Sequence, residues 1–582
     1  MGNRSGPDQD KLTGISLPSE LSKGAVAAWL ANLPLANLEY SSKALLALLG
    51  ELNRQEHREL VQQFDLIEVL RPQAIMLTRQ GAERLQGDVA FPLTPKYKAM
   101  AQVGVLMTEA LGRGYLTLAS SVDFLNDRIT SSRSRALVIF RALEASCLAL
   151  LRYRLAYESP GKGYWRNVYG LYTLAEGCGL QLETVDAAAG EAVQGTIQAK
   201  FNQIVLFALA NTQRHRVREI QQIDELLSRF AKLAVLRPVS GNENERALFF
   251  CDLAGDLPPR LCSAMAGLPG VACRIIETRP LVEGVLQHYA DPTRLVMDSP
   301  RPGKELLKRL LRALSGTERR KFQRFPESGD RSLIAGLEQI ISLLTSQPGA
   351  SRLPKLASTA VQYKGIKWLD IPNYSLETVS EGSLGDFGNK VRSEVAIGRA
   401  LDSNPEGVMR SQQVWSTADF VPSTGADSVA KVNTALLNAS AKGVCLSWAD
   451  RSDSCVRVGE LVGMPVDEGD LHVGVIRWLN HNAKSELVLG VELLAPSVKG
   501  VKVTLANHVD YQRPGLWIPE NRKLGQPASL LVQPAGFVSG QSVFLEAEQS
   551  RLCYRLEKLE ESSPSFQRFS MVEMESLPET FI

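Results

Sequence analysis

Residues 434–448 read TALLNASAKGVCLSW, two short apolar runs separated by a polar turn. The alternation of apolar and polar residues continues downstream in CVRVGELVGMPV, LHVGVIRWLNH, SELVLGVELLA and VKVTL, with turn residues between the segments. Apolar residues at every second position are typical of strands with one buried face, and several short strands in succession predict a small antiparallel β-barrel. A second β set follows at 515–561, before a polar end.

The N-terminal half repeats its apolar residues with helical rather than strand spacing. Examples are SSKALLALLGELNRQEHRELVQQF (41–64) and SSRSRALVIFRALEASCLALLRYRLAYES (131–159). We therefore predict a helical domain over 23–236, either an antiparallel bundle or an irregular helical repeat array, after a loose polar tail over 1–22. Residues 237–316 mix short apolar segments with the amphipathic stretch GKELLKRLLRALSG, and predict a mixed α/β connecting region.

Size and composition narrow the class of protein. The 582 residues predict several domains, and 65 Lys and Arg against 63 Asp and Glu disfavour a polycation that coats nucleic acid. No apolar run approaches the roughly 20 residues that span a bilayer, and the N-terminus shows no signal peptide, so we expect no membrane insertion. The eight cysteines are scattered without a CxxC pair, which predicts neither a zinc site nor a disulfide framework and favours a reducing cytoplasm.

Two short motifs carry the chemistry that the sequence reveals. The basic segment TERRKFQRFP (317–326) contains Arg320 and Arg324 in an RxxxR pattern, and NASAKG (438–443) forms an NxSxxG pattern at the end of an apolar strand. Two guanidinium groups on a loop offer bidentate donors to phosphates and to the O6/N7 edge of guanine. Asn and Ser add short polar contacts, and a glycine allows close backbone approach or a positive φ. Together they predict a phosphate-and-guanine site on a barrel rim.

At these residues the chain resembles the PilZ family of bacterial cyclic di-GMP receptors. The resemblance covers 317–345 and 433–505 and includes the later strands RVGELVGM, GVIRWLN and LVLGVELL. It implies a C-terminal PilZ-like antiparallel β-barrel with additional β segments, whereas the N-terminal half resembles no family that we can name. With the helical pattern of that half, a bundle or an irregular repeat array, we expect an α+β multidomain protein. The residues that it implies for binding cyclic di-GMP are Arg320 and Arg324 as phosphate and guanine clamps, Asn438 and Ser440 as guanine or ribose-phosphate contacts, Gly443 as the turn residue, and Arg319 and Lys442 as auxiliary cations.

The spacing of the two motifs departs from the family pattern. Arg324 and Asn438 are 114 positions apart (438 − 324), whereas family members have them within a few tens of residues. We therefore predict a barrel over 317–505 that carries an insertion at about 347–430, after a first strand at 331–337. A long insertion is compatible with a closed barrel because loop-closure entropy grows only logarithmically with length. Residues 506–582 are predicted to be an additional β segment and a polar tail.

Other interpretations stay open at this stage. The Arg segment could be a solvated basic turn at the end of a helix, and NxSxxG a plain Asx turn between strands. No HExxH, GxxxxGK[ST] or GxSxG occurs, so we expect no enzyme, no metal and no cofactor. We favour a cytoplasmic receptor that couples cyclic di-GMP to a helical output module, which binds a protein partner. The alternative is an adaptor with a degenerate, ligand-free barrel; a nucleic-acid-binding role is disfavoured.

Overall fold

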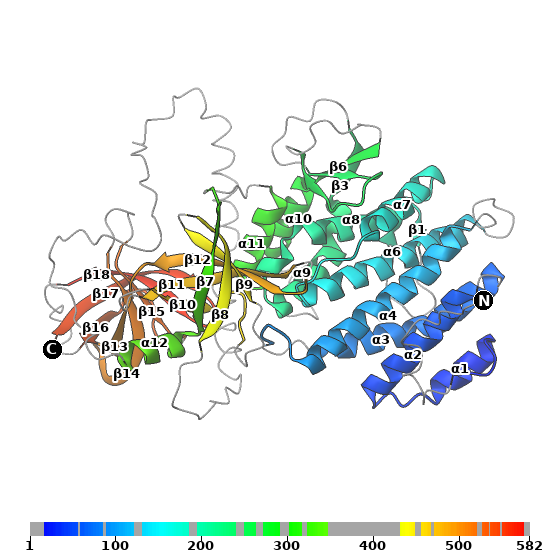
Figure 1. Cartoon of the computed structure of the whole chain (residues 1–582). Coiled ribbons are helices and arrows are strands. Elements are labelled where there is room, and N and C mark those ends of the chain that lie inside the picture. The colour runs from blue at the N-terminus through cyan, green and yellow to red at the C-terminus, as the bar shows by residue number, and fades with distance from the viewer. Residues whose placement is uncertain are drawn as a thin grey trace, which may run out of the picture. The chain divides into compact units, whose positions relative to one another are not determined.

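The computed structural model describes residues 17–55, 59–84, 89–121, 131–185, 195–239, 249–262, 272–290, 302–316, 323–346, 431–440, 442–448, 455–466, 471–482, 484–520, 527–534, 536–547 and 550–574. These residues belong to two compact units, each described here by itself. The helical unit contains the chain up to Glu318 except for Ala90–Pro92, and the barrel unit contains those three residues and the described residues from 323 onward. Figure 1 shows the helices and strands of both. Most of the predicted tail over 1–22 and all of 347–430 lie outside the described residues.

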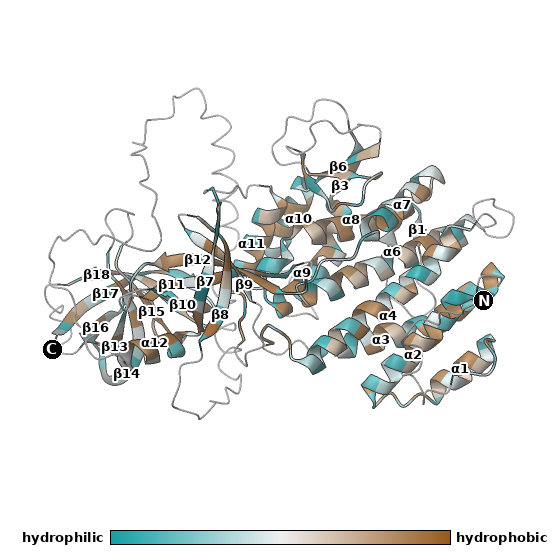
Figure 2. Ribbon diagram, viewed as in Figure 1, coloured by the Kyte–Doolittle hydropathy of each residue, from teal (hydrophilic) through white to brown (hydrophobic). Residues whose placement is uncertain are grey.

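The helical unit is built from helices that pack through their apolar stripes. In chain order these helices are α1 (Lys23–Ala31), α2 (Leu38–Arg54), α3 (Leu60–Glu83), α4 (Pro95–Ala119), α6 (Ser132–Leu155), α7 (Tyr164–Gly177), α8 (Ile197–Leu209) and α9 (Val217–Phe230). Helix α4 packs against α2, α3 and α6, and α6 also packs against α8. A side-chain cap is present at the start of α6, where the hydroxyl of Ser131 accepts a hydrogen bond from the Ser134 backbone N–H. Figure 2 shows apolar and polar residues on different sides of these helices.

A small sheet and two further helices complete the helical unit. The sheet has the order β3-β6-β4-β5, formed by β3 (Val235–Pro238), β4 (Phe249–Asp252), β5 (Arg260–Leu261) and β6 (Cys273–Glu277). A two-stranded sheet pairs β1 (Thr184–Val185) with β2 (Gly195–Thr196), and short 3-10 helices, η1 (Thr212–Arg214) and η2 (Ala231–Leu233), flank α9. Helix α10 (Arg279–Ala290) precedes α11 (Lys304–Leu314), which forms where GKELLKRLLRALSG predicts an amphipathic helix and buries its leucine face.

The first barrel closes six antiparallel strands in the order β10-β11-β12-β9-β8-β7. They are β7 (Phe325–Ala335), β8 (Val432–Ser440), β9 (Gly443–Trp448), β10 (Leu461–Pro465), β11 (Leu471–His481) and β12 (Leu487–Ala495), with helix α12 (Leu337–Ser346) following β7. The first strand is longer than the predicted 331–337 and begins at Phe325, because it pairs with β8 along its whole N-terminal part. Closure comes from β7 and β10, where Val462 pairs with Ala335.

A second closed barrel follows at once, and here the strand assignment from sequence was wrong. VKVTL (501–505) is not the last strand of the first barrel but lies in β13 (Lys499–Leu505), which pairs with β14 (His508–Ile518) and β16 (Ser542–Ala547). The barrel is completed by β15 (Ser529–Val532), β17 (Ser550–Ser562) and β18 (Gln567–Glu573). Only three residues separate β12 from β13, and such a short connection is typical of two strands that pair in a hairpin. The two strands nevertheless do not pair with each other, and the strands that do pair with β13 belong to the second barrel.

The two barrels share one hydrophobic core. Helix α12 contributes Ile340 and β11 contributes Val475, while β14 of the second barrel contributes Leu516 and the β17–β18 turn contributes Phe566; all four are fully buried. Burial of this apolar surface stabilises the pair of barrels together, since exposure of either half would return these side chains to water. The second barrel therefore supports the first barrel directly.

Candidate functional site

The two motifs meet where β7 begins. Phe325 pairs with Ala439, which lies between Asn438 and Ser440 on β8, and Pro326 pairs with Asn438. Arg324 immediately precedes this pairing and is exposed, so the second arginine of RxxxR lies beside the NxSxxG strand despite the long separation in sequence. Arg319 and Arg320 lie outside the described residues.

One row of residues crosses the outer side of the barrel next to Arg324. Backbone pairing places Asn438 on β8 opposite Cys445 on β9, Cys445 opposite Gly490 on β12, and Gly490 opposite Trp478 on β11. Residues paired directly across antiparallel strands have their side chains on the same face of the sheet. The alternate row, formed by Leu436, Leu446 and Leu489, is buried and fills the barrel interior. We call the row from Asn438 to Trp478, together with Arg324, Ser440 and Gly443, the outer binding face.

The thiol of Cys445 on this face is influenced by both Arg324 and Asn438. Burial raises the pKa of the Cys445 thiol, while the positive charge of Arg324 and a hydrogen bond with the Asn438 side chain act in the opposite direction. The strand pairing places the exposed Arg324 next to the part of β8 that carries the half-buried Asn438. A guanidinium and an amide are both groups that can donate hydrogen bonds to a bound anion or base.

Ser440 and Gly443 close the β8–β9 turn on the same face. The two residues pair, and the Ser440 hydroxyl donates to the Gly443 carbonyl oxygen at 3.1 Å. A Cβ atom on Gly443 would lie 2.6 Å from the Val491 carbonyl oxygen, so close backbone approach requires glycine here. The backbone that lies this close to Gly443 belongs to strand β12. Lys442, in the turn, is exposed, and its carbonyl accepts from the Leu493 backbone N–H at 2.9 Å.

Trp478 is the feature of this face that the motif analysis missed. The tryptophan is half-buried, and a Cβ atom on its cross-strand partner Gly490 would lie 1.9 Å from the indole Nε1. The indole therefore covers Gly490, and only glycine leaves room for it. The sequence alone gives no signal for this arrangement, because the pairing of the tryptophan in VIRWLN with the glycine in LVLGVELL depends on the strand register.

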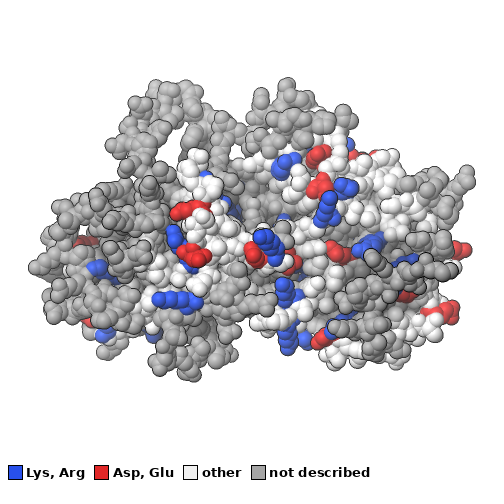
Figure 3. All heavy atoms as spheres, in the orientation of Figure 1, with Lys and Arg blue, Asp and Glu red and all other residues white. Residues whose placement is uncertain are grey.

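Charges are mixed on the face of the molecule that Figure 3 shows. On the side shown in Figure 3, Lys and Arg lie among Asp and Glu, and the described atoms show no extended area of one sign. Within the described ranges, no group of three or more His, Cys, Asp or Glu side chains could hold a metal ion. Among the same residues, no helix has the length and apolar content needed to cross a membrane.

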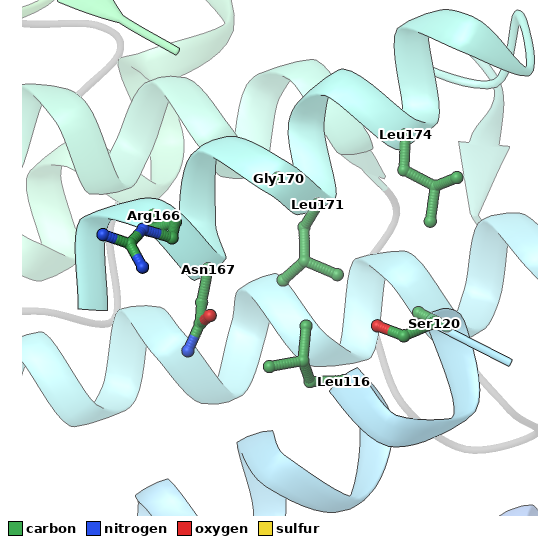
Figure 4. Close-up of a pocket in the computed structure, with 8 residues that line it drawn as sticks. Leu116, Ser120, Arg166, Asn167, Gly170, Leu171 and Leu174 are labelled. Carbon is green, nitrogen blue, oxygen red and sulfur yellow. The ribbon is translucent and has the colours of Figure 1, made fainter. Parts of the chain in front are cut away.

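A separate pocket of about 400 Å³ lies in the helical unit between α4 and α7. Figure 4 shows Leu116 and Ser120 on α4 across from Leu171 and Leu174 on α7, with Arg166 and Asn167 nearer one end. Its lining is mainly apolar and contains neither predicted motif. It is therefore distinct from the outer binding face.

The six-stranded antiparallel barrel, with an arginine beside an NxSxxG strand, defines a PilZ-type receptor domain, as the motifs suggested. Comparison with known proteins agrees. Three family models of the cyclic-di-GMP receptor FimW match this chain. The model of the FimW N-terminal domain matches residues 24–239, that of the middle PilZ domain matches 386–499, and that of the C-terminal β-barrel domain matches 500–574. The chain belongs to the FimW family of cyclic-di-GMP receptors, which are not enzymes.

A curated relative extends the match over nearly the whole chain. The cyclic-di-GMP receptor FimW of Pseudomonas aeruginosa is 23% identical over 559 residues, which cover 93% of this chain and 89% of that protein. No solved structure matches. The boundary between the middle and C-terminal family domains coincides with the start of β13. The middle-domain match begins inside 347–430, so the role of that segment as an insertion stays a prediction.

Proposed function

We propose that this chain binds cyclic di-GMP on the outer binding face of its first barrel. The observation that carries the proposal is the pairing of Phe325 with Ala439, which puts Arg324 beside Asn438 and Ser440. Arg324 supplies a planar donor pair for a phosphate or a guanine edge, and Asn438 offers an amide to a base. Arg319 and Arg320 precede this point in the chain, and we propose them, with Lys442, as further cations for the ligand.

Trp478 adds an aromatic surface to the same face. An indole lying over a glycine at the end of a polar row is suited to stack on a purine, because every base presents a π-face. The proposed ligand has two guanines and two phosphates, so a face with cations at one end and an aromatic ring at the other matches its chemistry. The function proposed is therefore that of a receptor: the ligand is bound, and no bond is formed or broken.

Calorimetric titration of the full chain tests the proposal. Wild type is expected to bind cyclic di-GMP with a Kd of roughly 1 μM or less. Arg324→Ala, Arg320→Ala and Asn438→Ala should each weaken binding about tenfold or more, because a charged or buried hydrogen-bonding partner is lost. Arg555→Ala is the matched control: its guanidinium is exposed on β17 and contacts Glu557 instead. Equal binding by wild type and an Arg320→Ala/Arg324→Ala double variant would refute the site.

We also propose that the helical unit receives a protein partner and that the protein works in the cytoplasm. The α4–α7 pocket is the place that we propose for such a partner, because its lining is mainly apolar. Gly170→Arg would fill the pocket without disturbing α7, since a Cβ there meets nothing within 4 Å, and Gly24→Arg is an equally unhindered control. A partner captured by wild type and by Gly24→Arg, but lost with Gly170→Arg, would support the pocket. Capture that survives Gly170→Arg would contradict it.

Nucleic-acid binding is the competing use of the same arginines, and we propose that it does not occur. Binding to phosphate backbones weakens steeply with salt because counterions are released on binding. On the side shown in Figure 3, the mixed charge of the described atoms gives little basis for such a contact. An RNA or DNA affinity that falls by orders of magnitude between low and moderate salt, and that vanishes with Arg324→Ala, would overturn this view.

A further inference from the structure

Arg477 joins the outer binding face to the second barrel. It directly precedes Trp478 on β11, and its Nε donates to a Glu492 carboxylate oxygen at 2.7 Å. Its two terminal nitrogens donate to the two carboxylate oxygens of Glu561, with Nη2 to Oε2 at 3.0 Å. Glu561 belongs to β17 of the second barrel. The arginine is thus held by a bidentate pair from one barrel while it neutralises a carboxylate of the other.

Glu492 lies at a sensitive position for an anionic ligand. On β12 it pairs with Gly443, which in turn pairs with Ser440, so its carboxylate belongs to the same row as the NxSxxG serine. The side chain is 41% exposed. An unneutralised carboxylate there would repel the phosphates of a ligand bound between Arg324 and Trp478, because like charges near a site raise the free energy of binding.

Glu561 fixes the geometry that lets Arg477 reach Glu492. A guanidinium has five N–H donors in a rigid plane, so a bidentate contact at its two terminal nitrogens leaves Nε facing the opposite way. The second barrel also holds Arg568 opposite Glu561 in the β17–β18 pairing. Arg568 thus adds a second positive charge beside Glu561.

We propose that Arg477 is a positioning residue for the ligand: anchored by Glu561 of the second barrel, it neutralises Glu492 beside Ser440 and so allows a dianionic nucleotide to bind. The inference rests on the proposed function. It gives the second barrel a role in nucleotide affinity, in addition to the buried side chains that it contributes to the common core. In this proposal Arg477 acts through Glu492 and not by contacting the ligand, and three of its N–H groups donate to the two carboxylates.

A double-mutant cycle in the full chain tests the inference, with binding of cyclic di-GMP measured by calorimetry. Arg477→Gln should weaken binding roughly tenfold, and the double variant Arg477→Gln/Glu492→Gln should restore it to within about threefold of wild type. Arg477→Gln/Glu561→Gln should not restore it, because Glu561 does not belong to the Ser440 row. Arg477→Lys, which keeps the charge but loses the bidentate fork, should fall between wild type and Arg477→Gln. Arg555→Gln serves as the control.

Thermal unfolding without ligand separates this role from a structural one. A purely structural Arg477 would lower Tm and affinity together, and Glu492→Gln would not rescue affinity in particular. The inference is overturned if Arg477→Gln binds as wild type does, or if removing Glu561 rescues binding as well as removing Glu492. If wild type itself fails to bind cyclic di-GMP, the proposed function falls and this inference falls with it; if wild type binds and only the rescue fails, the proposed function stands alone.

Discussion

Two glycines shape the outer binding face in different ways. At Gly443 the neighbour that would meet a Cβ is the backbone carbonyl of Val491, whereas at Gly490 it is the indole of Trp478. A backbone group can move only with its strand, but a side chain can rotate away. Alanine at Gly443 should therefore disturb the spacing of the strands, whereas alanine at Gly490 should displace the indole of Trp478.

Gly443→Ala should destabilise the protein by about 1–3 kcal/mol, because β9 and β12 must separate to admit the methyl group. Chemical denaturation followed by circular dichroism measures this change in the free energy of unfolding. Gly50→Ala, where a Cβ meets nothing within 4 Å on an α-helix, is the control and should not destabilise. An unchanged unfolding midpoint for Gly443→Ala would show that the strands tolerate the methyl group.

Trp478 should report ligand binding directly. If a guanine stacks on the indole, Trp478→Ala should weaken binding by about 1–3 kcal/mol, the usual contribution of one base–aromatic stack. Wild-type tryptophan fluorescence should change on titration with cyclic di-GMP, and Trp478→Phe should abolish that change while it retains much of the affinity. A fluorescence change that survives in Trp478→Phe must come from another tryptophan, and it would contradict the stacking of a guanine on Trp478.

At the scale of elements, α9 and α11 are joined through one half-buried carboxylate. Glu219 accepts from the Arg216 backbone N–H at 2.9 Å at the start of α9 and from Arg309 Nη2 of α11 at 2.5 Å. Burial raises the pKa of Glu219, but hydrogen bonding to His215 and the charge of Arg309 outweigh it and hold the pKa at about 2. The carboxylate thus caps one helix and anchors another.

This arrangement predicts a dependence of stability on acid. Because the pKa of Glu219 is lower in the folded than in the unfolded chain, its contribution of about 2 kcal/mol is complete above roughly pH 5 and is lost as the pH falls toward 2. Denaturation measured at pH 6, 4 and 3 should show a smaller loss for Glu219→Gln than for wild type. Parallel curves for the two proteins would mean that the contact is weaker than its geometry indicates.

The whole barrel unit should unfold as one body because the barrels share a core. Phe566 of the second barrel is fully buried against α12 and β11, so Phe566→Ala should cost about 3–5 kcal/mol. Hydrogen exchange followed by mass spectrometry should show faster exchange in β11 of the first barrel as well as in β18. Faster exchange confined to the second barrel would show that the two barrels open independently.

Much of the architecture was predictable from local pattern. Helical spacing in 23–236, strand spacing from 433 onward and the RxxxR and NxSxxG motifs indicated a helical half followed by a PilZ-type barrel, and the family match confirms both. These features depend on periodicity and on short-range chemistry, which a sequence displays directly. The positions of Arg324, Asn438, Ser440 and Gly443 in one place also agree with the motif.

Other features depend on which strands pair, and spacing along a chain does not contain that information. The assignment of VKVTL to a second barrel, the placement of Trp478 over Gly490 and the reach of Arg477 to Glu561 all follow from hydrogen-bonded register or from contacts between distant segments. Local order is set by neighbouring residues, but the face that we propose for binding is assembled from β8, β9, β11 and β12 and from Arg324, which precedes β7. Only the pairing of these strands brings the cation, the amide and the ring to one side.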